Sequence, residues 1–594
     1  MGAAVSPAAG GRRFGRDADP PAAAPPMSRD RLAAGLGWLV ACAALFRLNN
    51  WLWQTRGGAA IELLFWEARR RVLVDVAPPD LAVLLRTDQP LVLYLAAAAG
   101  GAAAAAAALG ATAALVLFRG WRDSLGAPGT PGTLRRRLDW LLWPLLGALC
   151  LLNPAVLVAG AQYPAQTLRA LLLLATTACL LRFALRAQTY ALLLAALSLG
   201  GLAFVDSSPW LLWIYAAAAL VLARRRPGDE QLSLVLMLLF PPVVLAAGRL
   251  AFAWALGGGA GAGEARRAAC AVAGWAQTSG AVEPACVDRS LPDALLQSAT
   301  SLVSYAPAYL LLAALAVAAA LVRTAGRARA AGGPPAPSVG AVRSGPLRWP
   351  GLVLLLLLPG VELLLRPLTA PEALTATPLD VLFPVLALPL LAGYAAPSRL
   401  VENPGPEAAP PPDPAPRSGA GRWLWWPGPL PLLLTLVLLV SGAFAAWVSL
   451  VPPSGPAPAV AGEPGRLLRT ARGTPSDPLV PFRQLSAVLD GRVQAGQRVL
   501  LQGEVLFPLV ALLDRGDALL LPSAPEYGLA VQRPAAFATY VVLAPPGPGR
   551  DQLAAQDVGW TERLRDYELL TDVRGVRVYV LRGASRPPGS VGVR

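Results

Sequence analysis

Long apolar runs separated by short polar stretches occupy the chain from residue 32 to residue 450. Most are near or somewhat short of the roughly 20 residues that an α-helix needs to cross a bilayer. The pattern predicts about eleven transmembrane helices, and hence an all-α polytopic membrane domain over residues 32–450. The predicted spans are 32–46, 90–118, 138–152, 168–185, 190–205, 210–223, 232–256, 302–322, 352–365, 379–395 and 423–450.

The pattern changes after residue 450, where shorter apolar runs are separated by turn residues. Period-two alternation and short buried runs predict strands, and one run of helical length follows the first of them. Nothing in this region resembles a phosphate-binding glycine loop. We expect residues 451–594 to contain a small α/β domain. Its predicted elements are strands at 498–504, 518–521, 538–544 and 576–581, a helix at 506–513, and turns at 545–549 and 572–575.

The composition agrees with a membrane protein. Hydrophobic residues make up 55% of the chain and charged residues 15%, whereas soluble domains average about 45–50% and about 25%. The chain contains no histidine and no lysine. The absence of histidine excludes Ser-His-Asp hydrolases, histidine-ligated zinc sites and H-E-x-x-H metalloproteases. Proton transfer must therefore depend on Asp, Glu or Tyr.

The arginines predict the topology. The net charge is +15, and arginine clusters fall on alternate connections between the apolar runs, which the positive-inside rule places in the cytoplasm. Residues 1–31 are then a disordered basic cytoplasmic tail, residues 396–422 a Pro-rich cytoplasmic linker, and residues 451–594 an extracytoplasmic domain. This arrangement predicts a multi-pass plasma-membrane protein whose main partner is membrane lipid. No nucleic-acid partner is expected, because the arginines do not form one basic face.

The first outer loop, residues 49–89, combines acids with arginines. Glu62, Glu67 and Asp75 are its first three acids, and three consecutive arginines follow Glu67 at positions 69–71. Residues 63–74 mix apolar positions with this charged cluster, which predicts an amphipathic helix at the membrane interface. A solvated charged helix without a catalytic role is the alternative interpretation.

Several local patterns accompany this order of elements. They are Phe46-Arg-Leu before Trp51-Leu-Trp, Ile61-Glu-Leu-Leu-Phe-Trp-Glu67, Gln89-Pro-Leu-Val-Leu-Tyr94, Asn153-Pro with Tyr163-Pro, and Leu199-Gly-Gly-Leu-Ala-Phe204. Together they resemble the GT-C membrane glycosyltransferases of the protein mannosyltransferase and aminoarabinose transferase type, over most of the chain. One departure stands out, because the family has Asp directly before Glu in the first loop and this chain has Ile61 before Glu62.

The resemblance implies transfer of a sugar from a polyprenyl-phosphate donor to a glycan, lipid or protein acceptor at the outer face of the membrane. Such a reaction needs a carboxylate to take the acceptor's proton and cations to hold the departing phosphate. Glu62 and Glu67 suit the first task, with Asp75 as a weaker candidate. No resident cofactor is expected, and assistance by a divalent cation stays open. The alternative is a non-catalytic protein of polysaccharide or lipid-linked sugar export or assembly that keeps the transferase frame, which would explain Ile61 directly.

Candidate phosphate-binding cations lie at the outer ends of predicted spans. Arg249 is inside the outer half of an apolar run, where an ionisable group usually faces the protein interior or snorkels to the interface. Arg169 begins another span. Glu362 and Arg366 are four residues apart and can pair on one helix face, so a local ion pair is the simpler interpretation for them. Cys270 and Cys286 share the outer loop at 257–301, and we predict a disulfide between them, with two free thiols as the alternative.

Overall fold

The computed structural model describes residues 29–54, 60–75, 89–125, 160–186, 189–205, 228–255, 479–502, 506–544 and 560–584, with a few isolated positions between them. The helices of the N-terminal half are α1 (Arg29–Gln54), α2 (Ile61–Val74), α4 (Pro90–Ala98), α5 (Ala102–Leu125), α8 (Pro164–Arg186), α9 (Thr189–Ala203) and α11 (Gly228–Ala255). The C-terminal helices are α19 (Val480–Asp490), α20 (Phe507–Leu512), the 3-10 turn η2 (Gly516–Ala518), α21 (Tyr527–Gln532), α22 (Pro534–Phe537) and α24 (Trp560–Arg563). The strands are β1 (Val499–Leu500), β2 (Leu519–Leu520), β3 (Tyr540–Leu543), β4 (Tyr567–Val573) and β5 (Val576–Leu581).

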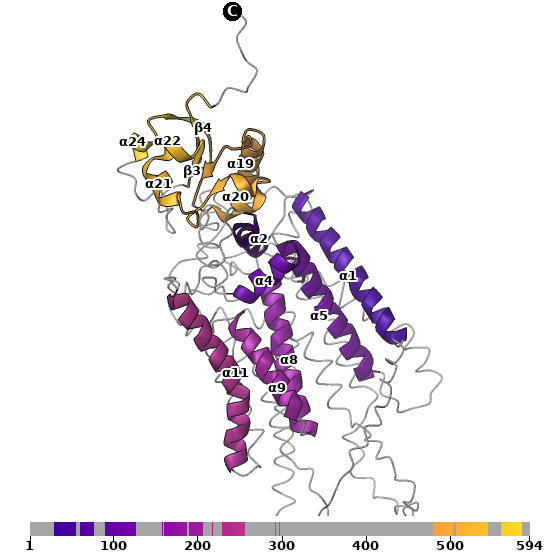
Figure 1. The fold of residues 1–594 in the computed structure, drawn as a ribbon. Helices are drawn as coiled ribbons and strands as arrows, with labels where there is room; N and C mark the ends of the chain where they lie inside the picture. Colours follow the sequence, from indigo (N-terminus) through magenta and orange to yellow (C-terminus); the bar gives the residue numbers. More distant parts are fainter. Residues whose placement is uncertain are drawn as a thin grey trace, which may run out of the picture.

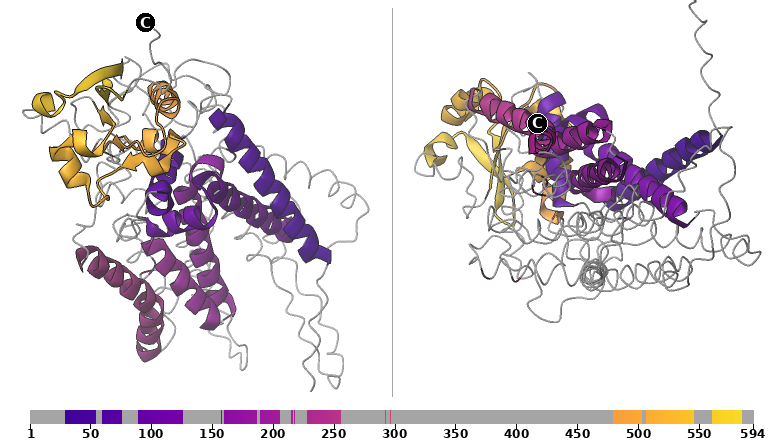
Figure 2. Two further views of the ribbon diagram at one scale, coloured as in Figure 1. Left: turned by 45° about the horizontal axis from the view of Figure 1, so that its top comes forward. Right: turned by 90° about the horizontal axis from the view of Figure 1, so that it is seen from below.

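The long helices form an elongated body with the C-terminal domain at one end (Figure 1). Helix α1 lies beside α5, and α8, α9 and α11 pack in sequence, while α1 and α11 lie on opposite sides of the body (Figures 1 and 2). Both outer helices expose large apolar side chains, including Leu36 on α1 and Phe240 on α11, which are 66% and 67% exposed. Such surfaces are typical of contact with lipid.

Within the described ranges, two helical segments are long and apolar enough to cross a membrane, Leu32–Leu52 and Gln231–Arg249. The bent pair α4–α5 would count as a third if it were one span, and α8 and α9 contain shorter apolar stretches. The predicted spans at 138–152, 302–322, 352–365, 379–395 and 423–450, and nearly all of 210–223, lie outside the described residues. The total of about eleven helices therefore stays a prediction.

The segment predicted as one span over residues 90–118 is a bent pair of helices, and whether it crosses the membrane as one broken span stays a prediction. Helices α4 and α5 meet at an angle of 102° instead of continuing as one rod. The chain turns at residues 99–101, where Gly100 has a φ of +77°, a conformation that glycine adopts without steric cost. The alanine-rich sequence on both sides favours helix equally, so the hydrophobic pattern alone gave no sign of the break.

Small residues bring the helices of the body close together. A Cβ atom built on Gly110 of α5 would lie 2.5 Å from the carbonyl oxygen of Gly160 and 2.9 Å from a methyl carbon of Leu45 on α1. Gly200 of α9 likewise faces Pro242 and Leu245 of α11. Close backbone approach through small residues is the usual way in which membrane helices associate.

The C-terminal domain has a five-stranded mixed sheet with strand order β2-β1-β3-β5-β4. Strand β1 is parallel to β2 and β3, and β5 is antiparallel to β3 and β4. Alternate residues enter two separate cores: Val499 packs on the side of α19 and α20, whereas Leu500 packs on the side of α21 and Trp560. The domain is therefore a three-layer arrangement with helices on both faces of the sheet.

The helix predicted at 506–513 and all four predicted strands are confirmed, although β1 and β2 are shorter than expected. The predicted turn at 572–575 joins β4 to β5, and Arg574 and Gly575 both have positive φ, as a two-residue type I′ hairpin requires. Strand β4 was not predicted. It is an edge strand with a register shift between Leu569 and Thr571, and its mixed burial obscures the alternation.

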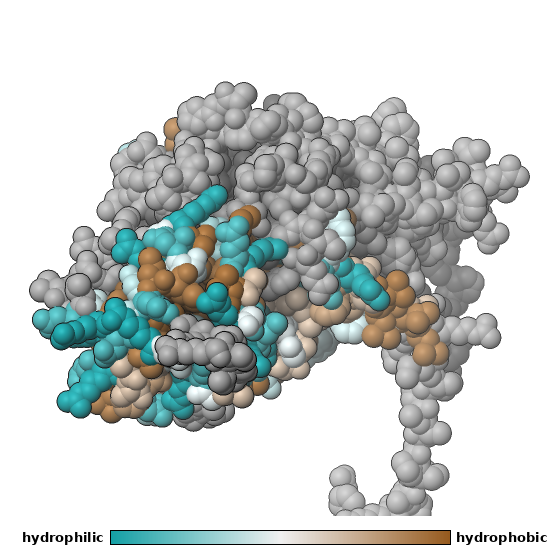
Figure 3. Space-filling model, turned by 90° about the horizontal axis from the view of Figure 1, so that it is seen from above, coloured by the Kyte–Doolittle hydropathy of each residue, from teal (hydrophilic) through white to brown (hydrophobic). Residues whose placement is uncertain are grey.

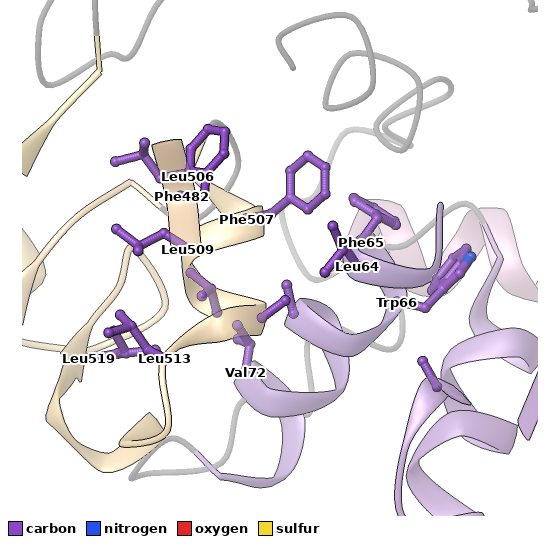
Figure 4. Packing of buried hydrophobic residues seen from close by; sticks show 14 of the residues in the cluster. Leu64, Phe65, Trp66, Val72, Phe482, Leu506, Phe507, Leu509, Leu513 and Leu519 are labelled. Atoms are coloured by element: carbon purple, nitrogen blue, oxygen red, sulfur yellow. The ribbon is translucent and has the colours of Figure 1, made fainter. Parts of the chain in front are cut away.

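One continuous apolar core joins the two halves of the molecule. It includes α2, α4, the start of α5 and the start of α8, together with α19, α20 and one face of the sheet. Helix α2 lies between the helical body and the C-terminal domain and contacts both (Figures 1 and 4). The charged first-loop helix is thus at the centre of the described structure.

Candidate active site at helix α2

Charged side chains near both termini of helix α2 stabilise the helix. Glu62 lies in the first turn and Arg71 in the last, where each opposes the partial charge of the helix terminus. The helix predicted at 63–74 is confirmed. Its buried residues, however, do not lie on one face only, as an amphipathic helix at the membrane interface would require. Four consecutive residues, Leu63–Trp66, are each at most 3% exposed, and four successive positions point around the whole circumference of a helix. The N-terminal half of α2 is buried on every side.

Glu62 is bound to the start of α8. Its Oε1 accepts a hydrogen bond from the Ala165 backbone N–H at 3.0 Å, and its Oε2 accepts one from the Gln166 side-chain amide at 3.0 Å. Ala165 is the second residue of α8, so the carboxylate satisfies an amide that has no partner within its own helix.

Glu67 is bound to the start of α5. Its Oε2 accepts a hydrogen bond from the Ala102 backbone N–H at 2.8 Å. Its Oε1 lies 2.9 Å from Arg70 Nη2 and 3.5 Å from Arg71 Nε, and the side chain is 14% exposed. Glu67 thus joins the C-terminal half of α2 to the first turn of α5.

Asp75 ends α2 and takes part in the same ion cluster. Its Oδ2 lies 2.9 Å from Arg70 Nη2, and the side chain is 37% exposed, far more than that of Glu67. Arg70 therefore links Glu67 with Asp75. This arrangement is that of a surface ion pair at a helix end, and such pairs contribute about 0–1 kcal/mol to stability.

The two described cation candidates lie at the same end of the helical body as α2. Arg169 is 6% exposed and belongs to α8, one helical turn beyond Ala165 and three residues after Gln166. Arg249 Nη1 donates a hydrogen bond to the carbonyl oxygen of Ala203, the last residue of α9, at 2.9 Å. The structure thus places Glu62 beside the first turn of α8, and Arg169 lies one turn further along α8. Arg249 instead links the ends of α9 and α11.

A buried amide network missed from the sequence fixes the start of α2. Gln162, which is fully buried, accepts a hydrogen bond from the Ala60 N–H at 2.8 Å and donates one to the Asn49 side chain at 2.7 Å. Asn49 in turn donates to the Ala103 carbonyl oxygen of α5 at 3.2 Å. Amides at the margins of apolar runs were the only sequence signal, and such residues are common in loops.

The remaining predicted site residues, Glu362, Arg366, Cys270 and Cys286, lie outside the described residues. Over the parts of the chain that the structure describes, no group of three or more His, Cys, Asp or Glu residues is arranged to hold a metal ion. The face at the top of Figure 1, seen directly in Figure 3, carries many hydrophilic side chains over the C-terminal domain. That distribution agrees with contact between this end of the molecule and water.

Asp490, at the end of α19, gives the C-terminal domain a pH dependence. Burial raises the pKa of its carboxyl, and repulsion by the Asp514 carboxylate raises it further. The hydrogen bond from the Asp514 backbone N–H and the charges of Arg71 and Arg515 lower the pKa, but the net shift is upward. Because the pKa of Asp490 is higher in the folded than in the unfolded protein, protonation of this carboxyl favours folding. The stabilisation is complete below the unfolded pKa near 4 and is lost as the pH rises through the folded-state pKa.

We expect Asp490→Asn to raise the melting temperature at pH 7, because asparagine keeps the acceptor for the Asp514 N–H (3.0 Å) and removes the charge. The gain should stay below about 1 kcal/mol, because the group is partly solvated. It should shrink toward pH 4. Thermal unfolding of the full-length protein in detergent at both pH values measures this, and a lower melting temperature at pH 7 would contradict the assignment.

Comparison of the chain with protein-family models, with curated proteins and with solved structures finds no significant match.

Proposed function

We propose that this chain is an integral membrane glycosyltransferase that moves a sugar from a polyprenyl-phosphate donor to an acceptor at the outer face of the membrane. The observation that carries the proposal is the junction between α2 and α8. There a carboxylate, Glu62, contacts the first turn of a helix that carries a buried arginine, Arg169, one turn further along. A base for the acceptor and a cation for the phosphate are the two groups that this reaction needs.

The position of this junction also supports the proposal. Glu62 and Arg169 lie where the helical body meets the C-terminal domain, at the end of the molecule from which the exposed helices α1 and α11 extend away (Figure 1). A lipid-linked donor reaches a protein from the bilayer, and a hydrophilic acceptor reaches it from water. In the proposed function, the donor and the acceptor meet at this boundary between the apolar helices and the C-terminal domain.

In the proposed reaction, Glu62 accepts the proton of the acceptor hydroxyl as the hydroxyl oxygen attacks the anomeric carbon of the donor sugar. The bond between that carbon and the phosphate oxygen breaks, and the polyprenyl phosphate leaves with the electron pair. Arg169 stabilises the charge on the departing phosphate. Glu67 has a structural role in this proposal, because its contacts with two arginines and the Ala102 N–H hold α2 against α5.

Transfer assays in reconstituted liposomes test the proposal. We expect the wild-type protein to transfer labelled sugar from at least one member of a panel of polyprenyl-phosphate donors. Glu62→Gln preserves the shape of the side chain and removes the proton acceptor, so the rate should fall about 10²–10⁴-fold. Glu568→Gln, at an exposed position on β4 in the C-terminal domain, is the matched control and should keep full activity.

Two outcomes would count against the proposal. Full activity of Glu62→Gln would refute the assignment of the base. A folded wild-type protein without transfer from any donor of the panel would favour the non-catalytic export or assembly protein, for which Ile61 before Glu62 is the natural sequence signal.

A further inference from the structure

The C-terminal domain makes three kinds of contact with α2, and the first is apolar. Phe65 of α2 packs edge-on against Phe507 of α20, with ring centroids 5.6 Å apart and an interplanar angle of 79°. Both rings are at most 3% exposed, and Val72 and Leu509 belong to the same core (Figure 4). The apolar side chains of α2 and α20 are thus buried by each other.

The second contact is polar and depends on Arg71. Its Nη1 donates hydrogen bonds to the carbonyl oxygens of Val510 and Leu513, at the C-terminal end of α20. A cation at this position satisfies carbonyls that have no partner within their helix and opposes the negative end of its dipole. The same guanidinium group lies 3.5 Å from Glu67, which caps α5. A continuous polar chain therefore runs from α20 through Arg71 and Glu67 to α5.

The third contact is a close backbone approach. A Cβ atom built on Gly516, just after α20, would lie 3.1 Å from the Cβ of Asp75 at the end of α2. This spacing is tighter than an ordinary van der Waals contact between carbon atoms. A Cβ at position 516 requires its neighbours to shift by a few tenths of an ångström, and a large side chain there should wedge the two segments apart.

We propose that the C-terminal domain is part of the active-site framework: it holds α2 against α5 and α8, and Arg71 is the positioning residue of this contact. The inference rests on the proposed function in one respect: the residue that the contact positions, Glu62, is the proposed base. The domain acts through α2 because both ends of the helix are fixed, by Glu62 on α8 at its start and by Arg71 and Asp75 against the C-terminal domain at its end. Loss of the second attachment leaves α2 held from one side only.

A disulfide between positions 75 and 516 tests the contact in full-length protein in membranes. We expect Asp75→Cys with Gly516→Cys to form a cross-link, because the Cβ separation of 3.1 Å needs to grow only slightly to reach the roughly 3.5–4.5 Å of disulfides. Adding Arg71→Ala should lower the yield of the linked peptide, measured by mass spectrometry, several-fold. Adding Arg577→Ala, which removes an exposed arginine paired with Asp572 on the distant hairpin, is the control and should not change it.

Hydrogen–deuterium exchange provides a second readout that does not require catalysis. Arg71→Ala and the wedge variant Gly516→Leu should each speed exchange in residues 61–74 by about tenfold or more, the factor that corresponds to the loss of one good hydrogen bond. Arg577→Ala should leave exchange in this segment at the wild-type rate. The wedge variant keeps Arg71 and changes only the spacing, so agreement between the two variants would identify docking as the cause.

Transfer kinetics provide the third readout. Arg71→Ala should lower kcat at least about tenfold while the KM for the donor stays within about twofold, because the donor site itself is not changed. Arg71→Lys keeps the charge near the α20 carbonyls and should restore part of kcat. A wild-type protein without transferase activity would refute the proposed function but leave the first two readouts intact. Failure of the cross-link to form, or wild-type exchange in both variants, would overturn the positioning role.

Discussion

Gly110→Ala is expected to destabilise the helical body by roughly 3 kcal/mol, the upper part of the usual range for overpacking. The added methyl group would lie 2.5 Å from the Gly160 carbonyl oxygen and 2.9 Å from Leu45, so α5 can accept it only by moving away from its neighbours. The contact on one side is backbone, which cannot turn aside as a flexible side chain can. Thermal unfolding in detergent, followed by the loss of the monodisperse elution peak, measures the effect.

Gly248→Ala is the matched control. Gly248 also lies within a long helix, α11, but a Cβ atom built on it has no described atom within 4 Å. Alanine favours helix over glycine by about 1 kcal/mol, so this variant should be at least as stable as the wild type. Equal melting temperatures for Gly110→Ala and the wild type would show that α5 does not approach Gly160 as closely as described.

Glu67→Ala is expected to release the junction between α2 and α5. The change removes the partner of two arginines and of the Ala102 N–H from a site where the side chain is 14% exposed. Removing one member of a buried ion pair costs about 3–5 kcal/mol where the remaining charge is left alone. Here Arg70 keeps Asp75, and Arg71 keeps the carbonyl oxygens of α20. These contacts and solvation of the exposed part should bring the cost to the lower end of this range. Exchange of the amides at the start of α5 should rise on the order of 100-fold.

Glu67→Gln separates the contribution of charge from that of shape. Glutamine keeps an oxygen that can accept from the Ala102 N–H but loses the ion pairs with Arg70 and Arg71. We expect an intermediate effect, with slower exchange at Ala102 than in Glu67→Ala. If both variants exchanged at the wild-type rate, Glu67 would not be a cap, and its role as a proton acceptor would need to be considered again.

The sequence predicted elements whose signal is local. The helix at 63–74 and the strand at 576–581 follow from periodicity and turn residues within a few positions, and both are present. The break between α4 and α5 was missed because the only local signs, Gly100 and Gly101, lie in an alanine-rich run that favours helix on both sides. The total number of membrane helices, their orientation and the transferase activity stay predictions.

The candidate site was predicted in its residue types but not in its roles. Glu62 and Glu67 are candidates because proton transfer needs a carboxylate, yet both bind backbone amides, 103 and 35 residues away respectively. No pattern in the sequence distinguishes a glutamate that will meet a distant helix terminus from one that will meet water.

The attachment of α2 to two helix termini limits how this segment can diverge. Glu67 comes five positions after Glu62, a rise of about 7.5 Å with a turn of about 140° around the axis, which lets one helix reach α8 on one side and α5 on the other. Inserting or deleting one residue between them would rotate one carboxylate by about 100° and uncap one terminus. Distant relatives of this chain should therefore be recognised by two acids at a spacing of five followed by adjacent arginines, even where the surrounding apolar sequence has changed completely.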